Sequence, residues 1–335
     1  MRLNQKEKYE IILLVERSEL GVNRTLKEFQ LHKSTFYKWY NAYLEDGYDG
    51  LADKPCQRKQ YWNRISEKER QLVVETALEH PEKSSREVAC LIIDNHNRYI
   101  SESSVYRILK SKGLITAPAF ILSHAADEFK DKTVRVNEMW QTDFTYFKIS
   151  GWGWYYLSTV LDDYSRFIIS SKLCKTMKAA DVRETIDRAL NVAGLSKNQM
   201  PKLLTDNGSC YVSSELNNFL ADQKIPHIRG RINHPQTQGK IERYHRSMKN
   251  VIKLDVYFTP EELERKIAEF VYYYNYKRYH ESLNNVTPAD AYYGRANKII
   301  EMREKIKTKT LNDRRSIYFK NKSSNFAFTN LNSLN

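Results

Sequence analysis

Three acidic residues stand in contexts that suit metal-dependent phosphoryl transfer. Asp143 lies in the β-rich run Trp140–Tyr146, and Asp206 closes a short apolar strand that turns at Asn207-Gly208. After Asp206, 35 residues intervene before Glu242. Carboxylates that converge on two divalent ions about 4 Å apart can drive in-line phosphoryl transfer, and hard oxygen ligands suit Mg²⁺ or Mn²⁺. The three acids are therefore the candidate catalytic residues and the candidate ligands of two such ions.

Each acid taken alone also fits an ordinary structural role. Asp143 could be a polar residue of a half-exposed strand, Asp206 a turn former, and Glu242 a solvated helix position. The nearby pair Asp162-Asp163 is interpreted as part of a turn, with one of the two close enough to lie near the metals. The occurrence of all three acids, in order and in matched contexts, favours the catalytic interpretation.

These motifs resemble those of integrase-like Asp-Asp-Glu transposases of bacterial insertion sequences, whose catalytic core is shared with retroviral integrases. The resemblance runs from about Asn137 to Arg295 and includes the spacing of the last two acids, the run Gln-Gly-Lys-Ile-Glu-Arg around Glu242, and a closing segment, Tyr274–His280 with Thr287-Pro288. It implies an RNase H-like catalytic domain that cleaves DNA at the ends of a mobile element and joins those ends to a target. It also implies two Mg²⁺ or Mn²⁺ ions per active site and at least a homodimer on double-stranded DNA.

The chain is expected to be multidomain, with all-α modules ahead of an α/β domain. At 335 residues it is long enough for two or three domains. The expected divisions are an N-terminal helix-turn-helix at 1–48, a linker at 49–64, a second helix-turn-helix at 65–114, a linker at 115–136, the RNase H-like domain at 137–295 and a basic C-terminal tail at 296–335.

Two tandem helix-turn-helix modules are expected to recognise the element's terminal repeats. In the first, Thr25 to Glu28 reads as a capping box, and a helix from about Ser34 carries one aromatic face. In the second, helices are expected to begin at Ser66, Ser84 and Ser101. Each module could instead be a plain helical bundle. The residues expected to face DNA are Lys33, Thr35, Tyr37, Lys38 and Asn41 in the first module and Ser103, Ser104, Arg107 and Lys110 in the second.

The catalytic region is predicted to contain a mixed five-stranded sheet of the RNase H-like kind. Three successive strands at 138–148, 154–162 and 165–173 indicate an antiparallel meander. Helices and strands then alternate: a helix at 179–192, the strand ending at Asp206, a helix at 214–223 and a short strand at 227–229. A helix at 260–279 is expected to pack on the sheet. The chain beyond Arg295 is rich in Lys, Arg, Asn and Ser, and its apolar periodicity fades after about Leu311. This tail is expected to be mobile and could bind DNA backbone, with a plain solubilising terminus as the alternative.

The helix that carries Glu242 is expected to serve DNA as well as metal. The polar loop 230–239 before it is interpreted as a segment that repositions Glu242 when DNA binds. Arg246 and Lys249 follow Glu242 on the same helical face and could hold phosphates, although a plain basic face is the alternative. Lys240 is a further candidate for DNA contact. His234 and His245 are interpreted as DNA-facing or structural residues and not as metal ligands.

Composition excludes several other classes of protein. A net charge of +13 favours a polyanionic partner. The four cysteines show no structural zinc spacing, which separates this chain from the retroviral branch with its His/Cys module. The sequence offers no membrane span and no phosphate-binding glycine loop of the Walker type, so no membrane partner and no nucleotide cofactor are expected. The expected location is the bacterial cytoplasm, in association with the nucleoid.

Two alternative functions remain at this point. An inactive, transposase-derived DNA-binding regulator would bind element ends without cutting them, and intact acids argue against it. A nuclease of the RNase H type would cut without joining, and the tandem DNA-binding modules argue against that.

Overall fold

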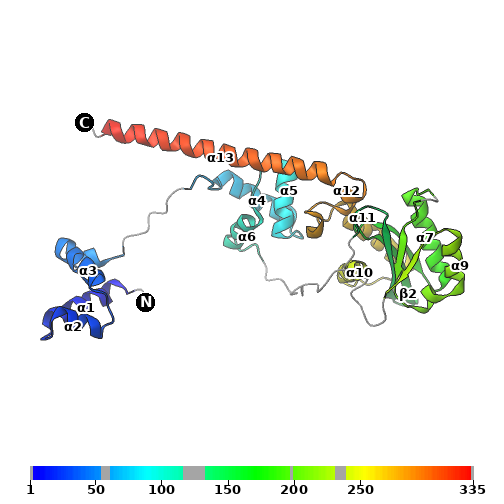
Figure 1. The fold of residues 1–335 in the computed structure, drawn as a ribbon, viewed down its shortest axis with the longest axis horizontal. Helices are drawn as coiled ribbons and strands as arrows, with labels where there is room; N and C mark the ends of the chain where they lie inside the picture. Colours follow the sequence, from blue (N-terminus) through cyan, green and yellow to red (C-terminus); the bar gives the residue numbers. More distant parts are fainter. Residues whose placement is uncertain (1–2, 54–60, 116–132, 197–198, 231–238, 333–335) are drawn as a thin grey trace. The chain divides into compact units, whose positions relative to one another are not determined.

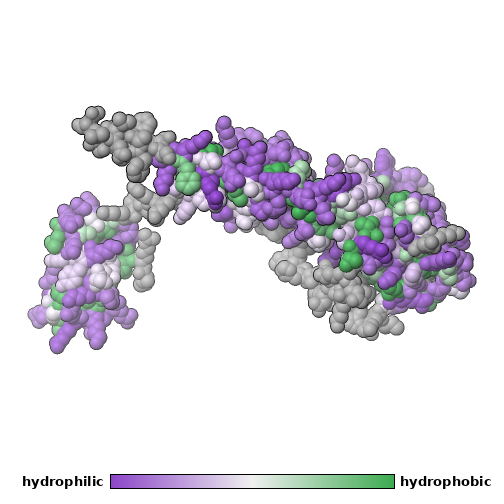
Figure 2. All heavy atoms as spheres, turned by 45° about the horizontal axis from the view of Figure 1, so that its top comes forward, coloured by the Kyte–Doolittle hydropathy of each residue, from purple (hydrophilic) through white to green (hydrophobic). Residues whose placement is uncertain are grey.

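The computed structural model describes residues 3–53, 61–115, 133–196, 199–230 and 239–332. The chain divides into two units, residues 1–61 and 62–335, which are treated separately below. In the described parts no helix combines the length and apolar character needed to cross a bilayer. On the face drawn in Figure 2, hydrophilic side chains predominate and hydrophobic ones are scattered among them.

The first unit is a small helical bundle. Its elements are α1 (Gln5–Arg17), α2 (Val22–Glu28), α3 (Lys33–Asp46) and the short 3-10 helix η1 (Gly47–Leu51). Ile12, Leu26 and Phe36 form its centre. The expected capping box at Thr25 is wrong, because α2 already begins at Val22. The Thr25 hydroxyl instead donates to the Leu20 carbonyl from within the helix, a local bond that a Thr can make without capping anything.

The second unit opens with another three-helix bundle, formed by α4 (Glu67–Glu79), α5 (Ser85–His96) and α6 (Glu102–Ser111). Capping boxes start α4 and α5, as the sequence predicts. The Ser66 and Ser84 hydroxyls accept hydrogen bonds from the amides of Glu69 and Glu87, and the carboxylates of these glutamates accept hydrogen bonds from the amides of the capping serines. Val105 and Ile108 of α6 pack into the bundle core with Val73. The opposite side of α6 therefore faces solvent.

The remainder of the second unit is built on a mixed five-stranded sheet in the order β3-β2-β1-β4-β5 (Figure 1). The strands are β1 (Met139–Ile149), β2 (Gly153–Asp162), β3 (Ile168–Cys174), β4 (Lys202–Thr205) and β5 (His227–Arg229). The first three form the expected antiparallel meander, and β4 and β5 join β1 in parallel. The predicted fold class, helical modules followed by an RNase H-like α/β domain, is confirmed.

One edge of β1 is open along most of its length. β4 pairs only with Met139, Trp140 and Gln141, whereas β2 follows β1 from Trp140 to Ile149 on the other side. Among the described residues, β1 from Thr142 onward therefore has a strand on one side only. Asp143 lies at the start of this open edge.

Helices cover both faces of the sheet. On one face α7 (Ala179–Ala193), α8 (Ser209–Val212) and α9 (Ser214–Asp222) enclose a core that includes Trp140 and Val160. On the other face α10 (Gly239–Ile252) and α11 (Pro260–Tyr276) pack against Phe147 and Ile149. The sequence did not predict α8, a single turn that immediately follows Asp206 and Gly208. The expected packing of the helix that begins at Pro260 is confirmed.

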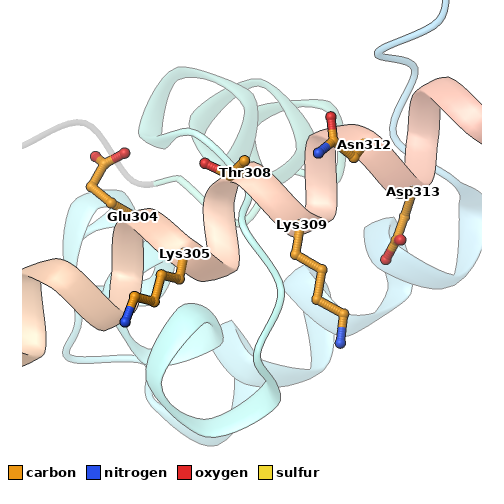
Figure 3. A pocket seen from close by; sticks show the side chains of 6 residues that line it. All are labelled: Glu304, Lys305, Thr308, Lys309, Asn312 and Asp313. Atoms are coloured by element: carbon orange, nitrogen blue, oxygen red, sulfur yellow. The ribbon is translucent and has the colours of Figure 1, made fainter.

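The C-terminal segment, which was expected to be mobile, is helical over residues 296–332. After η3 (Glu281–Leu283) and α12 (Pro288–Tyr292), this segment forms one long helix, α13 (Ala296–Asn332). Its Lys, Arg and Glu residues favour helix without an apolar stripe. Figure 3 shows one flank of α13, which carries the charged and polar residues Glu304, Lys305, Thr308, Lys309, Asn312 and Asp313.

Polar contacts join α13 to the second helical bundle. Arg303 donates two hydrogen bonds to Asp94 of α5, from Nε at 2.7 Å and Nη2 at 2.6 Å. Asp94 also accepts a hydrogen bond from the Tyr279 hydroxyl at 2.7 Å. Farther along α13, Arg314 donates to the Glu69 carboxylate of α4 at 2.9 Å. Because polar pairs make this contact, hydrophobic periodicity alone could not have predicted it.

Candidate active site

Asp143 is held at the open edge of β1 by two neighbours. The Phe144 amide donates to one carboxylate oxygen at 2.8 Å, and His245 Nδ1 lies 3.3 Å from the other. The other ring nitrogen of His245 lies 3.2 Å from the hydroxyl of Thr159, the residue of β2 that faces Asp143 in register. The Asp143 side chain is 22 % exposed, so its carboxylate remains accessible from solvent.

Asp206 follows the last residue of β4 and is exposed. The Gly208 amide donates to its carboxylate at 2.8 Å, which closes a tight turn. Glycine is required there for space: a Cβ at Gly208 would lie only 3.0 Å from Asp206 Oδ1. The Asn207 side-chain amide donates to the Gly230 carbonyl at 2.9 Å and so ties this turn to the end of β5.

Glu242 lies in the first turn of α10 and is exposed. Desolvation and the nearby charge of Asp143 raise the pKa of Glu242 above its usual value, and Arg246 and His245 oppose that rise only in part. Residues 231–238 lie outside the described part of the chain, so the expected repositioning loop stays a prediction. The expectation for His234 likewise falls outside it.

The charge of Asp143 acts on Glu242 and on the surroundings of Asp206. Asp143 raises the pKa of Glu242, and after desolvation both Asp206 and Asp143 raise the pKa of the Cys210 thiol, to about 11. The same two aspartates act on buried Tyr211. In the ranges that the structure describes, however, no three His, Cys, Asp or Glu side chains come close enough to enclose a metal ion. The acids thus lie on β1, after β4 and on α10, without forming a closed ligand shell among the described residues.

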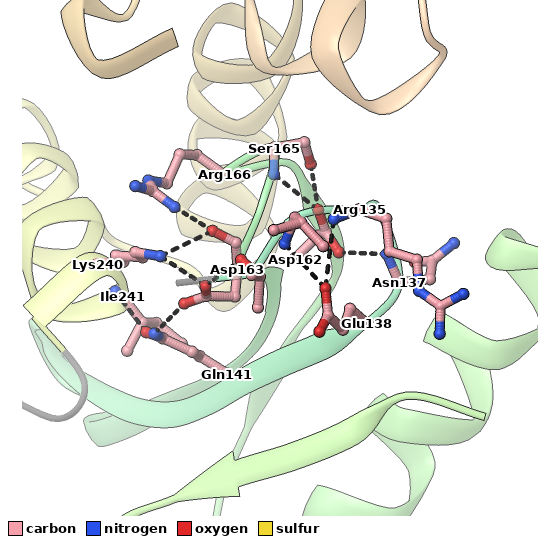
Figure 4. A network of polar contacts seen from close by, with 12 residues as sticks. Arg135, Asn137, Glu138, Gln141, Asp162, Asp163, Ser165, Arg166, Lys240 and Ile241 are labelled. Atoms are coloured by element: carbon pink, nitrogen blue, oxygen red, sulfur yellow. Dashed lines mark hydrogen bonds and ion pairs between the residues drawn. The ribbon is translucent and has the colours of Figure 1, made fainter. Parts of the chain in front are cut away.

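A buried polar network fixes the start of α10 on the sheet (Figure 4). The Lys240 ammonium lies 2.5 Å from a carboxylate oxygen of Asp163, whose side chain is only 3 % exposed. Gln141 donates to the other Asp163 oxygen at 2.7 Å and accepts the Ile241 amide at 3.1 Å. Asp163 lies in a turn, as expected, but it also anchors the helix that carries Glu242.

The network and the His245 contact were not foreseen from sequence. Local spacing carries a weak signal for both: His245 follows Glu242 by three positions on α10, and Gln141 precedes Asp143 by two on β1. Whether either side chain would turn toward the acids depends on how α10 packs, which the sequence does not state. Lys240 is engaged by Asp163, and its predicted contact with DNA stays a prediction.

The other residues predicted to contact DNA lie on solvent-facing surfaces. Lys33, Thr35, Tyr37, Lys38 and Asn41 on α3 are all exposed. On α6, Ser103, Arg107 and Lys110 are exposed, whereas Ser104 is half-buried and accepts a hydrogen bond from Arg107. On α10, Arg246 is exposed and Lys249 half-buried. Desolvation and nearby Lys253 lower the pKa of Lys249, against the opposing effect of Asp143.

Comparison with known families assigns the sheet domain. Residues 133–235 and 223–288 each match an integrase core domain. The sheet domain is thus similar to integrase core domains. Residues 2–52 and 35–109 match homeodomain-like domains, which agrees with the helical modules ahead of the core. The resemblance to integrase-superfamily transposases that the three acidic motifs suggested is therefore confirmed.

Relatives of the integrase-core chain include bacterial and viral proteins. The transposase for transposon Tn552 of Staphylococcus aureus is 25 % identical over 72 % of this chain and 55 % of its own length. The Gag-Pro-Pol polyprotein of mouse mammary tumor virus is 32 % identical over 37 % of this chain and 7 % of its own. The chain thus spans about half the length of the Tn552 transposase and much less of the viral polyprotein.

Among solved structures, the catalytic core domain of HTLV-2 integrase in complex with magnesium is similar to this chain. The two sequences are 23 % identical, the match covers 48 % of this chain and 98 % of the HTLV-2 chain, and the TM-score is 0.39. The catalytic core domain of BIV integrase is 20 % identical, with 48 % and 97 % covered and a TM-score of 0.37.

Proposed function

We propose that this protein is an insertion-sequence transposase that binds the ends of a mobile element, cleaves DNA beside them and transfers the freed strands to a target. The observation that carries the proposal is the placement of Asp143, Asp206 and Glu242 on β1, after β4 and on α10 of an integrase core domain. Integrase-superfamily membership implies polynucleotidyl transfer as the reaction class. The assignment of residues and substrates is ours.

The donor set fits a hard divalent cation. All three groups are carboxylates, and the raised pKa of Glu242 reflects, after desolvation, repulsion from Asp143 that such a cation would relieve. We propose that Asp143 and Asp206 hold Mg²⁺, or Mn²⁺, and that Glu242 completes the set when DNA is present. Two ions per site would activate a water or a terminal DNA hydroxyl and stabilise the leaving oxygen.

The other residues of the site hold the acids in place. His245 braces the Asp143 carboxylate against Thr159, and the Gly208 amide orients Asp206. Exposed Arg246 and half-buried Lys249, which follow Glu242 along α10, would contact the phosphates on either side of the scissile bond. No covalent intermediate with the protein is required, because water and a DNA hydroxyl are interchangeable nucleophiles in this geometry.

Outside the catalytic domain, the exposed faces of α3 and α6 would contact double-stranded DNA at the terminal repeats. Because an element has two ends, we propose that at least two copies of the chain assemble on DNA. These statements rest on the homeodomain-like matches and on the exposure of the residues named above.

The deciding experiment uses DNA that flanks the gene and contains its inverted repeats. With Mg²⁺, the wild-type protein should nick this DNA and join its ends to a second duplex, and Asp206→Asn should abolish both steps while retaining end binding. Asp222→Asn, an exposed aspartate at the end of α9, is the matched control and should remain active. Strand transfer retained by Asp206→Asn would refute the site assignment.

The same assay separates the two alternatives. Cleavage without joining would identify a nuclease of the RNase H type, and end binding without cleavage would identify a regulator. Neither has an observation in its favour that the transposase proposal lacks.

A further inference from the structure

An exposed aromatic surface extends from the candidate active site along the hairpin of β1 and β2. Tyr146, Trp152 and Trp154 are 52 %, 54 % and 53 % exposed. None of the three belongs to either hydrophobic core of the sheet domain. Folding therefore gains little from large rings at these positions, and we refer to them, with Lys148 and Lys249, as the aromatic platform.

The rings of the platform are ordered with respect to one another. Tyr146 and Trp154 lie edge to face, with ring centroids 5.4 Å apart. Trp152 lies in the turn between the strands, where Gly151 and Gly153 have φ values of 76° and 89° that other residues adopt only with strain. The Ser150 amide donates to the Tyr257 carbonyl at 3.3 Å and fastens the tip of the hairpin to the segment after α10.

Cations accompany the rings, and the hairpin itself carries no acid beyond Asp143 until Asp162. The Lys249 ammonium lies 4.4 Å from the centre of the Tyr146 ring, and that of Lys148 lies 6.0 Å from the Trp154 ring. From Phe144 to Leu161 the sequence contains no Asp or Glu. A partner of this surface must therefore offer flat apolar faces together with negative charge.

The platform adjoins the catalytic acids. Tyr146 follows Asp143 by three residues on one strand, so their backbones are about 10 Å apart, about the length of three stacked nucleotides, and their side chains leave opposite faces of the sheet at the open edge. α10 packs on the face of β1 that carries Phe147 and Ile149, so Lys249 reaches Tyr146 across the open edge of the strand. The charge of Asp143 is also felt at Lys249. One extended ligand can therefore contact both places.

We propose that the aromatic platform binds unpaired nucleotides, with bases stacked on Tyr146 and Trp154 and backbone phosphates beside Lys148 and Lys249. Exposed rings flanked by cations bind single strands without strict sequence preference, because every base has a flat face to stack. The role of the platform at a cleaved DNA end rests on the function proposed above. The affinity of the platform for unpaired strands does not depend on that function.

The test compares one DNA duplex with and without a short oligothymidine overhang. Binding of the full-length protein is followed by fluorescence anisotropy with EDTA present, so that no cleavage occurs. Duplex contacts of the helical modules are common to both probes and cancel in the ratio of affinities. Wild-type protein should bind the overhang duplex about fivefold or more tightly than the blunt one.

Three variants assign that ratio to the platform. Trp154→Ala should bring the ratio close to one, and Trp154→Phe should retain most of it because a ring remains. Tyr272→Ala is the matched control: Tyr272 is 57 % exposed and pairs with Tyr276 on α11, away from the active site. It should leave the ratio unchanged.

Several results would overturn the inference. An overhang that adds no affinity would do so, as would an unchanged ratio for Trp154→Ala. If Trp154→Ala instead changes the association state measured by sedimentation without DNA and leaves the ratio intact, the platform is a contact between copies of the chain. A protein that prefers overhangs but never cleaves DNA would support the platform inference and contradict the proposed function. A protein that cleaves DNA but shows no preference for overhangs would contradict the platform inference alone.

Discussion

The His245 ring links two strands at the centre of the candidate site. Asp143 and Thr159 face each other in register on β1 and β2, and the two nitrogens of the ring contact one each. Nδ1 of the ring can donate to the carboxylate while Nε2 bonds the hydroxyl, so both neighbours have a partner. His245 and Glu242 thus share α10, and a shift of this helix would disturb both Glu242 and the contact that holds Asp143 on β1.

At the same scale, Lys240 offers a direct test of how the start of α10 is held. Lys240→Met leaves the Asp163 carboxylate buried without its cation, which should lower the free energy of unfolding by about 3–5 kcal/mol in urea titrations. Because Glu242 lies two residues farther along α10, the concentration of Mg²⁺ needed for half-maximal strand transfer should also rise.

Lys175→Met, at an exposed lysine after β3, is the control and should change unfolding by no more than about 0.5 kcal/mol. A Lys240→Met protein with unchanged stability and unchanged Mg²⁺ dependence would show that the network does not position the helix.

At the scale of elements, the sequence predicted what local patterns encode. The meander, the capping boxes at Ser66 and Ser84, and the short strand at His227–Arg229 all depend on neighbours along the chain, and all are confirmed. The missed elements depend on partners distant in sequence. α13 carries its contacts to the second bundle on Arg303, Thr310 and Arg314, which are spread among many other polar residues.

The candidate site shows the same division. The contexts of Asp143, Asp206 and Glu242 are local and could be identified in the sequence. Their braces are not local: His245 meets Thr159, and Lys240 meets Asp163, only once α10 has packed on the sheet. Sequence patterns therefore identified the acids and left their supports unassigned.

The contact between α4 and α13 should depend on pH. Burial alone would raise the pKa of Glu69, but hydrogen bonds from Arg314 and from Ser66 outweigh it and hold this pKa below its usual value. A carboxylate whose pKa is lowered by folding adds stability above its unfolded pKa of about 4.3, and that stability is lost as the pH falls through the folded value.

Thermal unfolding between about pH 6 and pH 3 should accordingly separate the wild type from Glu69→Gln. The variant should be less stable at neutral pH by about 1–2 kcal/mol, and the difference should shrink toward acid pH. Equal curves for the two proteins at every pH would show that the Glu69 charge contributes nothing to the docking of α13.

At the scale of the second unit, two of the ion pairs that join α13 to the helical bundle differ widely in burial. The Arg303 and Asp94 side chains are 12 % and 23 % exposed, whereas Arg98 and Asp313 are 47 % and 44 % exposed. A buried charge left without its partner is costly, and an exposed pair contributes little.

Asp94→Ala should therefore destabilise the docked bundle by about 3 kcal/mol or more and speed amide hydrogen exchange in α5 and in α13 near Arg303. The matched variant Asp313→Ala should cost less than about 1 kcal/mol and leave exchange nearly unchanged. Similar effects of the two substitutions would contradict the assignment of Asp94 as the main joint.

The contact at Asp94 affects the distance along DNA between the recognised sequence and the cleaved bond. Asp94 of α5 bonds both Arg303 of α13 and Tyr279, which follows α11, so the bundle that contains α6, the helix proposed to contact the terminal repeats, is tied to the sheet domain. The protein would then fix the number of base pairs between two positions on the DNA, the sequence that α6 contacts and the bond that is cleaved. Inserting half a helical turn of DNA between the two would place one of them on the wrong side of the duplex.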